Sequence, residues 1–460
     1  MPDRALAQAD RAAPARVGLL AVAWVLAVGC QPPPVADPAS ATPAVAGIGA
    51  SDAADARDHD APAGGTLDPA VAQAETARIL AEVAQARNLE VTRTVQVDVI
   101  SREGIRAFAK DSMYEHTTKE EMALMGRIQA GLGVMPRGID PEQVMLDLLE
   151  DGVLGLYDPK TQTLRIGDFV SKGMLSMVVG HEIAHGLQDM HFDLDKHQLP
   201  IRHDSDAETA RRFLIEGDAQ AAYLAWVSGE QGLEAIADPV LDAMGNQTLD
   251  MAALASPYPV LARSLQLPYA DGTATVARLV RDKGWKAVDA LYTDLPQTSE
   301  QMLHLDKLLS RESARDVQID AAALVAKLPG LASVWHDTIG EAELLAMLAN
   351  VAPSLTAREA AAGWGGDRLV ALDRPKDPMV VPLVVYAVAW DTEADAEQFA
   401  SLFGDYLLEV SPRDHAIDRR GDTVVVAVGI PSGVSANTVV RATWAATKVG
   451  PKSRGKGARK

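Results

Sequence analysis

The sequence predicts an α+β protein with a mainly helical body and a smaller α+β domain at its C-terminal end. Three observations support this fold class. The chain from about residue 70 to 450 is too long for one ordinary hydrophobic core, which indicates two domains. Helical apolar spacing dominates residues 70–350, with one short hairpin before a histidine-rich helix. Residues 351–450 instead mix strand and helix patterns.

The body begins with helices and one strand. Periodic apolar patterns predict helices at residues 70–87, 103–111 and 117–131 and a strand at 91–100. Asp140 suits a helix N-cap and Pro141 the first helical position, so another helix begins there. Residues 153–157 and 163–166 flank the turn sequence Asp-Pro-Lys-Thr-Gln and predict a hairpin. This small sheet therefore precedes the helix that carries the main motif.

The most informative motif is His-Glu-Ile-Ala-His at residues 181–185, inside an apolar helical run. Histidines at i and i+4 face the same side of a helix, so both imidazoles can reach one Zn²⁺ at about 2.0–2.1 Å. Glu182 is then placed to touch a water in the open position of the metal. The motif predicts His181 and His185 as zinc ligands and Glu182 as the catalytic acid/base.

A third protein ligand is needed, and His191 is one candidate. It stands at the spacing of the third histidine in the pattern H-E-x-x-H-x-x-G-x-x-H. However, Gln188 occupies the place of the glycine on which that turn depends. If the helix continues instead, His191 points away from the metal.

Glu216 is the favoured third ligand. It lies on a second helix expected over residues 206–226, which starts with acidic side chains suited to a helix N-terminus. Glu216, Gln220 and Tyr223 share one face of that helix. A carboxylate among apolar neighbours completes a site of two histidines and one glutamate.

Residues 181–192 together with Glu-Gly-Asp-Ala at 216–219 resemble the gluzincin-type zinc metallopeptidases found among bacterial lipoproteins and secreted proteins. Further segments share the resemblance, which spans most of the chain after residue 90: residues 154–159, 268–272, 296–304 and 363–368. The resemblance implies a zincin-like fold for residues 70–350. It also implies His181, His185 and Glu216 as zinc ligands and Glu182 as the catalytic acid/base.

Two side chains are candidates to orient the ligand histidines. The thermolysin-like pattern has an aspartate four residues after the ligand glutamate, and this chain has Gln220 there. A glutamine oxygen can still accept an imidazole N–H. Asp189 is the second candidate, because His181, His185 and Asp189 form one i, i+4, i+8 row.

The expected reaction is hydrolysis of a peptide or protein substrate. Candidates to stabilise the oxyanion of a tetrahedral intermediate are Tyr223, Tyr269 and His304. A peptide bond of the cell wall is one substrate within this chemistry. The alternative function is a zincin-like lipoprotein without catalysis that serves as a binding or envelope-assembly module.

The first thirty residues predict export and lipid attachment. Basic residues precede an apolar run at residues 17–28 that is too short for a membrane span, so residues 1–29 are expected to be a signal peptide. Cys30 is the only cysteine and stands where lipoprotein signals place the lipidated residue, although Ala27 replaces the usual leucine. Gln31 favours the outer membrane. The alternative is a cleaved signal with an incidental Cys30.

Charge and composition limit the partners. The formal net charge of −20 disfavours nucleic acid as a partner, because an acidic protein repels phosphate.

Residues 30–69 are rich in Pro, Ala, Asp and Gly and predict a disordered tether between the membrane and the body. Residues 451–460 predict a basic disordered tail. With Cys30 lipidated, no disulfide remains to stabilise the fold.

Residues 351–450 predict the smaller α+β domain. Strands are expected at residues 369–372, 383–390 and 423–430, and a helix at 435–448. Thr392 is suited to cap another helix, with Asp395 completing a start that resembles a capping box. This region shows no ligand constellation, so we expect it to pack against the body or position substrate.

Overall fold

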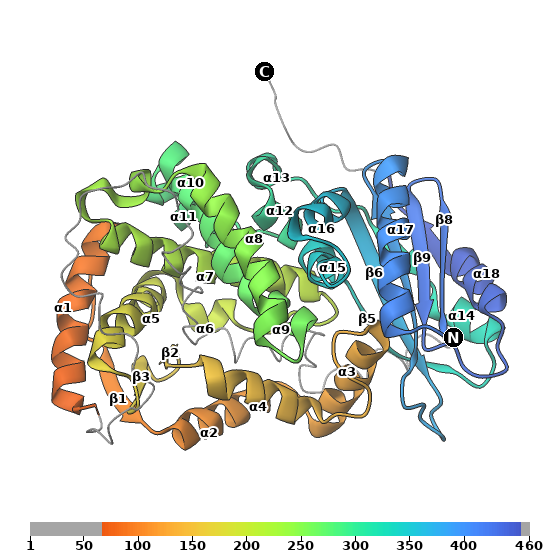
Figure 1. Cartoon of the computed structure of the whole chain (residues 1–460), viewed down its shortest axis with the longest axis horizontal. Helices are drawn as coiled ribbons and strands as arrows, with labels where there is room; N and C mark the ends of the chain where they lie inside the picture. Colours follow the sequence, from red (N-terminus) through yellow and green to blue (C-terminus); the bar gives the residue numbers. More distant parts are fainter. Residues whose placement is uncertain (1–66, 452–460) are drawn as a thin grey trace, which may run out of the picture.

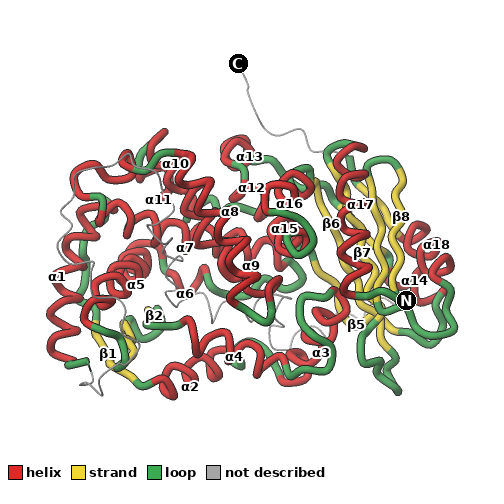
Figure 2. The backbone as a smooth tube through the Cα atoms, in the orientation of Figure 1, coloured by secondary structure: helices red, strands yellow, loops and turns green. Residues whose placement is uncertain are grey.

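The computed structural model describes residues 67–451, which form a mixed α+β protein (Figure 1). Helices build one side of the molecule and a sheet lies on the other (Figure 2). The expected signal peptide, Cys30 and the tail beyond residue 451 lie outside the described residues. Within residues 67–451, no helix is both long and apolar enough to cross a membrane.

The N-terminal elements place a three-stranded sheet beside helix α5. They are α1 (Pro69–Arg87), β1 (Gln96–Ile100), α2 (Arg102–Met113), α3 (Lys119–Leu132), α4 (Pro141–Gly152), β2 (Gly155–Asp158), β3 (Thr163–Gly167) and α5 (Lys172–Phe192). Asp140 caps α4 by accepting from the Glu142 amide, as the sequence predicts. Strand order is β1-β3-β2, with β1 parallel and β2 antiparallel to β3. Strand β2 is therefore an edge strand, and it contacts α5.

The middle of the chain is helical and is organised around α7 (Ser205–Val227), a helix of 23 residues. The other elements of this region are α6 (Leu194–His197), η4 (Gly229–Ala235), α8 (Asp238–Ala255), α9 (Pro259–Leu267), η5 (Pro268–Gly272), α10 (Thr273–Lys283), α11 (Trp285–Leu291), α12 (Ser299–Leu303) and α13 (Leu305–Ser310). Of these, η5 is a π-helical turn. Helix α7 contacts α5, α10, α12 and η5, so it is the central element of the body.

The C-terminal part is a five-stranded antiparallel sheet with helices on both faces. Its elements are β4 (Val317–Ile319), α14 (Ala321–Lys327), β5 (Ala332–Asp337), α15 (Gly340–Leu348), α16 (Ser354–Ala361), β6 (Trp364–Asp373), β7 (Leu383–Trp390), α17 (Glu393–Val410), β8 (His415–Arg420), β9 (Thr423–Val428), α18 (Ala436–Ala446) and β10 (Thr447–Val449). Strand order is β5-β6-β7-β9-β8. The sheet thus begins with β5, ahead of residue 351.

The side chains of β7 alternate between the two faces of the sheet, and helices cover both faces. Val384 and Tyr386 belong to the core cluster that includes α17, whereas Leu383 and Val385 pack with α14 and α18. Successive side chains of a strand point to opposite faces, so one apolar strand serves two helical layers. The helix expected at residues 435–448 ends earlier, because residues 447–449 form β10 and pair with β4.

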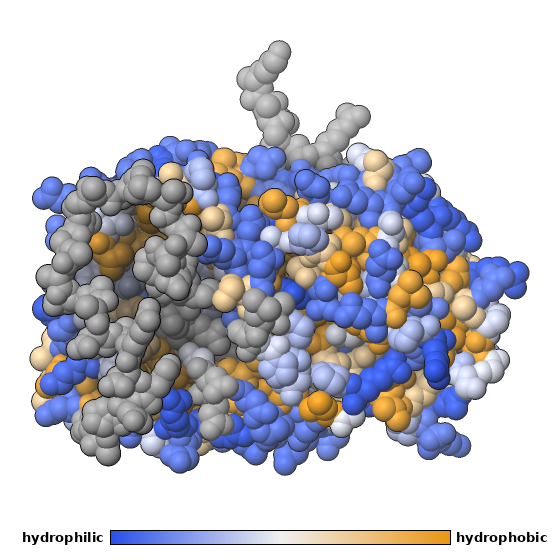
Figure 3. All heavy atoms as spheres, viewed as in Figure 1, coloured by the Kyte–Doolittle hydropathy of each residue, from blue (hydrophilic) through white to orange (hydrophobic). Residues whose placement is uncertain are grey.

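One apolar core joins the helical body to the sheet. Phe213 of α7, Leu344 of α15 and Tyr386 of β7 belong to the same buried cluster. Large exposed apolar side chains come from separate elements, for example Leu355 and Val380. On the face drawn in Figure 3, hydrophobic residues are interspersed with hydrophilic ones. The described residues therefore pack as one body around a shared core.

Polar contacts also tie α7 to the sheet. Asp337 of β5 accepts from the backbone N–H of Ser205 at 3.0 Å and from its hydroxyl at 2.7 Å. The amide of Asp206 donates to the carbonyl oxygen of Thr338 at 3.1 Å. The first turn of α7 is therefore held by its own N-cap, Asp204, and also by residues that follow it by more than a hundred positions.

Candidate metal centre

Helix α5 contributes two histidines and α7 one glutamate to a compact buried group that could hold a metal ion. Nε2 of His181 and Nε2 of His185 are 3.2 Å apart. Oε2 of Glu216 lies 3.4 Å from the first nitrogen and 3.3 Å from the second. Ligand atoms of a tetrahedral zinc at about 2.0–2.1 Å are separated by about 3.3–3.4 Å. The three atoms thus have the spacing of three corners of such a site.

The carboxylate oxygen between the histidines has no hydrogen-bond donor. Oε2 of Glu216 is buried, and no N–H or O–H of the described residues is aligned with it. A buried acceptor without a partner costs free energy. A cation between the three ligand atoms would remove that cost. The unpaired oxygen therefore fits a metal site better than a purely structural contact.

Two glutamines orient the imidazoles. Nδ1 of His181 lies 3.0 Å from Oε1 of Gln220, and Nδ1 of His185 lies 2.8 Å from Oε1 of Gln188. An amide oxygen only accepts, so each Nδ1 carries the proton and each neutral ring presents the Nε2 lone pair to Glu216. This is the tautomer that a metal ligand requires.

Charges in the group are strongly coupled. Burial lowers the pKa of His185, but the Glu216 and Glu182 carboxylates outweigh it and raise that pKa to about 9. Burial and the positive charge on His185 lower the pKa of His181. Burial raises the pKa of Glu216, yet the two histidines leave it below its usual value. The carboxylates of Glu216 and Glu182 therefore favour a positive charge between the three ligand atoms, which a metal ion would supply.

Two glycine contacts bring the supporting elements close. A Cβ on Gly180 of α5 would lie 2.6 Å from the Trp226 ring of α7, so only glycine permits this helix contact. A Cβ on Gly217 would lie 2.4 Å from the carbonyl carbon of Gly272. Helix α7 and the η5 turn therefore touch backbone to backbone, directly beside the ligand Glu216.

Glu182 is fixed by the edge strand of the small sheet. Its side chain is fully buried, and Oε2 accepts the backbone N–H of Tyr157 at 2.9 Å. Because this amide points away from β3, it lies on the free edge of β2. The backbone of β2 thus fixes the side chain of Glu182. This residue lies between the two ligand histidines in the sequence and beside them in space.

Asp189 does not occupy the orienting position expected from the sequence. In the described residues its hydrogen bonds go to the Tyr157 hydroxyl at 2.9 Å, the Leu194 amide at 3.0 Å and the Arg93 guanidinium. The Nδ1 of His185 is taken by Gln188, one residue earlier. Asp189 therefore acts on the site only through Tyr157, whose backbone binds Glu182.

The three candidates to stabilise an oxyanion lie at different places relative to the metal group. Tyr269 of η5 has its ring centroid 5.7 Å from that of His181, so it borders the metal group. Tyr223 packs beside Gly180 and Trp226 at the α5–α7 contact. Nε2 of His304 lies 2.8 Å from Oε1 of Glu341 on α15, an ion pair that joins helices.

His191 is separate from the metal group. Helix α5 continues to Phe192, and Nε2 of His191 lies 2.7 Å from the carbonyl oxygen of Glu90. The uninterrupted helix turns this histidine away from His181 and His185, because residues six apart do not share a face. Of the two candidates for third ligand, the structure brings only Glu216 to the histidines.

Gln188 and Tyr157 support the site, although the sequence did not lead us to expect either of them. Gln188 also donates from Nε2 to the carbonyl oxygen of Ile215 at 2.9 Å, which ties α5 to the residue before Glu216. The available signal was its place three residues after His185, where helical side chains can meet. The sequence could not have indicated the role of the Tyr157 amide, because every residue of a strand carries the same backbone N–H group.

Comparison with known proteins gives one match. Residues 329–451 match a family described as a domain of unknown function (DUF8575). The match covers the five-stranded sheet and the helices from α15 to α18, but not α14, α5 or α7. No curated protein and no solved structure is significantly similar to the chain.

Proposed function

We propose that the protein is a zinc-dependent peptidase with a zincin-like body, in which His181, His185 and Glu216 hold the metal ion. The observation that carries the proposal is the spacing of the three ligand atoms, between 3.2 and 3.4 Å, with the buried Glu182 next in sequence to His181. A bound zinc ion lowers the pKa of water and polarises a carbonyl group.

Glu182 is the proposed acid/base. Its carboxylate accepts a proton from the attacking water and returns that proton to the nitrogen of the leaving amine. The Tyr157 amide keeps one oxygen of Glu182 occupied at 2.9 Å, which fixes the direction of the other. The acid/base is thus positioned by the backbone of β2, and its geometry does not depend on a mobile side chain.

Strand β2 supports the choice of a peptide as substrate. It is the edge strand of the small sheet, and its free edge faces the helix that carries the histidines. The Tyr157 amide on this edge is taken by Glu182, so an extended peptide would pair with the remaining backbone groups of the edge. Tyr269 is then the proposed donor to the developing oxyanion, since its ring lies beside His181. The leader sequence supports the accompanying proposal of export and lipid attachment at Cys30.

The decisive experiment combines metal analysis with digestion of a denatured-protein library. Glu182→Gln should retain one zinc per chain and lose essentially all cleavage, because the amide cannot take up a proton. The exposed Glu120→Gln on α3 is the matched control and should cleave like the wild type. Cleavage by Glu182→Gln at the wild-type rate, or wild-type cleavage that a chelator leaves unchanged, contradicts the proposal.

A further inference from the structure

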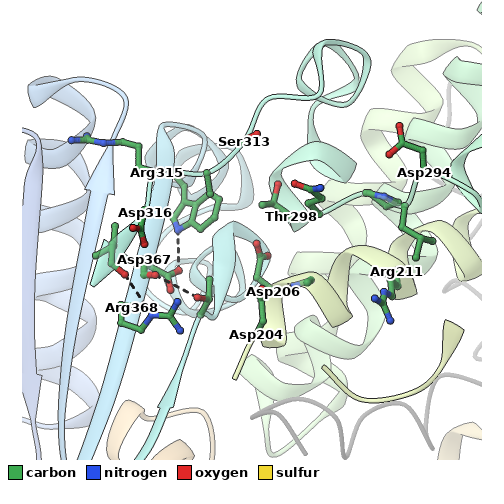
Figure 4. Close-up of a pocket in the computed structure, with 18 of the residues that line it drawn as sticks. Asp204, Asp206, Arg211, Asp294, Thr298, Ser313, Arg315, Asp316, Asp367 and Arg368 are labelled. Carbon is green, nitrogen blue, oxygen red and sulfur yellow. Dashed lines mark hydrogen bonds between the residues drawn. The ribbon is translucent and has the colours of Figure 1, made fainter. Parts of the chain in front are cut away.

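A cavity lies between the helical body and the sheet, apart from the metal group. Its volume is about 520 Å³, which is in the range of small-molecule sites. Figure 4 shows the first turn of α7 on one side and β6 on the other. Segments 293–298 and 313–317 close the remaining walls. Two of the motif segments noted in the sequence, residues 296–304 and 363–368, contribute to the lining.

Asp206 lines this cavity and has one carboxylate oxygen without a hydrogen-bond partner among the described residues. The side chain is 1% exposed, and its Oδ1 accepts the Ser299 amide at 2.9 Å. Its Oδ2 is buried and has no donor among the described residues. A buried carboxylate oxygen is normally satisfied, so this atom marks the place where a donor from a ligand fits. Burial and the nearby Asp204 and Asp367 raise the pKa of Asp206, which favours its protonated form, so a ligand ammonium would have to displace that proton.

The opposite wall presents a guanidinium without a carboxylate partner. Arg368 of β6 points into the cavity (Figure 4). Its contacts are to two backbone carbonyls, Val317 O at 3.5 Å and His203 O at 3.3 Å. Within residues 67–451 it forms no ion pair. Asp367 cannot supply one, because its oxygens accept from Ile339, Gly340, Trp364 and Tyr386.

We infer that the cavity binds a zwitterion of the amino-acid or short-peptide class. The ligand ammonium donates to Oδ2 of Asp206 from one side, and the ligand carboxylate accepts from Arg368 on the other. A metal ion fits the cavity less well. The groups of described residues whose ligand atoms lie close enough to chelate an ion are His181, His185 and Glu216, and Glu300, Glu312 and Asp391; neither includes Asp206.

The cavity is distinct from the metal centre. Asp206 and Glu216 lie on the same helix, and their positions are about 15 Å apart along its axis. Binding in the cavity therefore requires neither zinc nor Glu182. The inference does not rest on the proposed peptidase activity, and it can be tested in protein that cannot cleave peptides.

The test is calorimetric titration of the metal-free full chain, with Glu182→Gln as background, using L-alanyl-L-alanine as the probe. We expect saturable binding that weakens about tenfold or more when the dipeptide is N-acetylated or when its C-terminus is amidated. Asp206→Asn and Arg368→Gln should each cause a loss of similar size. The side-chain oxygen that remains in Asp206→Asn can still accept the Ser299 amide, so the helix start is preserved.

Asp282→Asn, at an exposed position of α10, is the matched control and should bind the dipeptide like the background protein. If Asp206→Asn fails to fold, the partly exposed Arg368→Gln carries the test. The inference is overturned if no saturable binding appears up to about 10 mM dipeptide. It is equally overturned if the capped dipeptides bind as well as the free one, or if the folded cavity variants retain full affinity.

Discussion

At the scale of single residues, the candidate metal centre is shaped by neutral amides. Gln220 and Gln188 accept from the Nδ1 atoms of the two histidines. A carboxylate in either place would make its imidazole more basic, whereas an amide fixes the tautomer without adding charge. Glu216 is therefore the negative charge that faces both Nε2 atoms.

Loss of either orienting amide should weaken the metal site. We expect Gln188→Ala and Gln220→Ala each to lower zinc affinity by about 10- to 100-fold, measured by competition with a fluorescent chelator. Gln188→Ala should have the larger effect, because Gln188 also binds the Ile215 carbonyl. Gln231→Ala, at an exposed position of η4, is the control. Unchanged affinity in both variants would show that the histidines are oriented by other contacts.

Glu343 gives the molecule a specific pH dependence. Burial raises the pKa of Glu343 from 4.5 to about 7, although the Ser264 hydroxyl and the Arg212 charge both lower it. Because the folded state holds this proton more tightly, the stability it confers is complete below about pH 4.5 and is lost as the pH rises to about 7. Glu343→Gln removes that loss.

The unfolding free energy of Glu343→Gln, relative to that of the wild type, should be about 2.5 kcal/mol higher at about pH 8 than at about pH 5. Urea denaturation of both proteins at the two pH values measures the gain. A difference between them that stays constant with pH would mean that Glu343 is already ionised at pH 5.

At the scale of elements, the contact between α7 and η5 determines where Glu216 and Tyr269 lie. Gly217→Ala places a methyl group 2.4 Å from the Gly272 carbonyl carbon. We expect a loss of about 1–3 kcal/mol in unfolding free energy together with weaker zinc binding, because the two backbones must separate.

Gly404→Ala in α17 is the matched comparison for that substitution. A Cβ at this position meets nothing within 4 Å. Alanine should therefore stabilise the helix by about 0.5–1 kcal/mol and leave zinc binding unchanged. Thermal and urea denaturation measure both variants. Equal effects of the two substitutions would rule out the backbone contact as the cause.

Elements with a strong local signal were predictable from sequence. Strand β7 was predicted at its observed bounds, because apolar residues on both faces mark a buried strand. Strand β8 was missed, since its sequence His-Ala-Ile-Asp-Arg-Arg is that of a partly exposed edge strand. Strand β1 is shorter than expected, because only residues 96–100 pair with β3. Edges and strand ends are set by partners that a local pattern does not contain.

The same distinction applies to the sites. Histidines at i and i+4 with a glutamate between them are a local pattern, so the sequence led directly to His181, Glu182 and His185. The cavity beside Asp206 gave no such signal. Its walls come from segments separated by more than a hundred residues, and only the tertiary structure brings Arg368 opposite Asp206.

At the scale of the whole molecule, the helical body and the sheet share one apolar core, so we expect them to unfold as one cooperative unit. Removing residues 329–451, the matched family region, would expose the shared core and take away Asp337 from the start of α7. We expect a chain that ends at residue 328 to show no cooperative urea transition and no tight zinc binding. Cooperative unfolding of that fragment would show that the body is autonomous.

Asp337→Ala tests the same coupling in the full chain. It leaves both the amide and the hydroxyl of Ser205 without their acceptor. We expect a loss of about 2–4 kcal/mol in unfolding free energy, because each buried unsatisfied donor costs about 1–3 kcal/mol. A loss below about 1 kcal/mol would mean that water replaces the carboxylate.

The capping of α7 by β5 also has a consequence for biosynthesis. A ribosome completes α5 and α7 well before it reaches Asp337, so the growing chain contains both histidines and Glu216 while the amide and hydroxyl of Ser205 still lack this acceptor. The ligand helix can become fully stable only after the sheet has been translated. For the peptidase proposed above, this order of synthesis would delay the metal-binding geometry until the sheet has been translated.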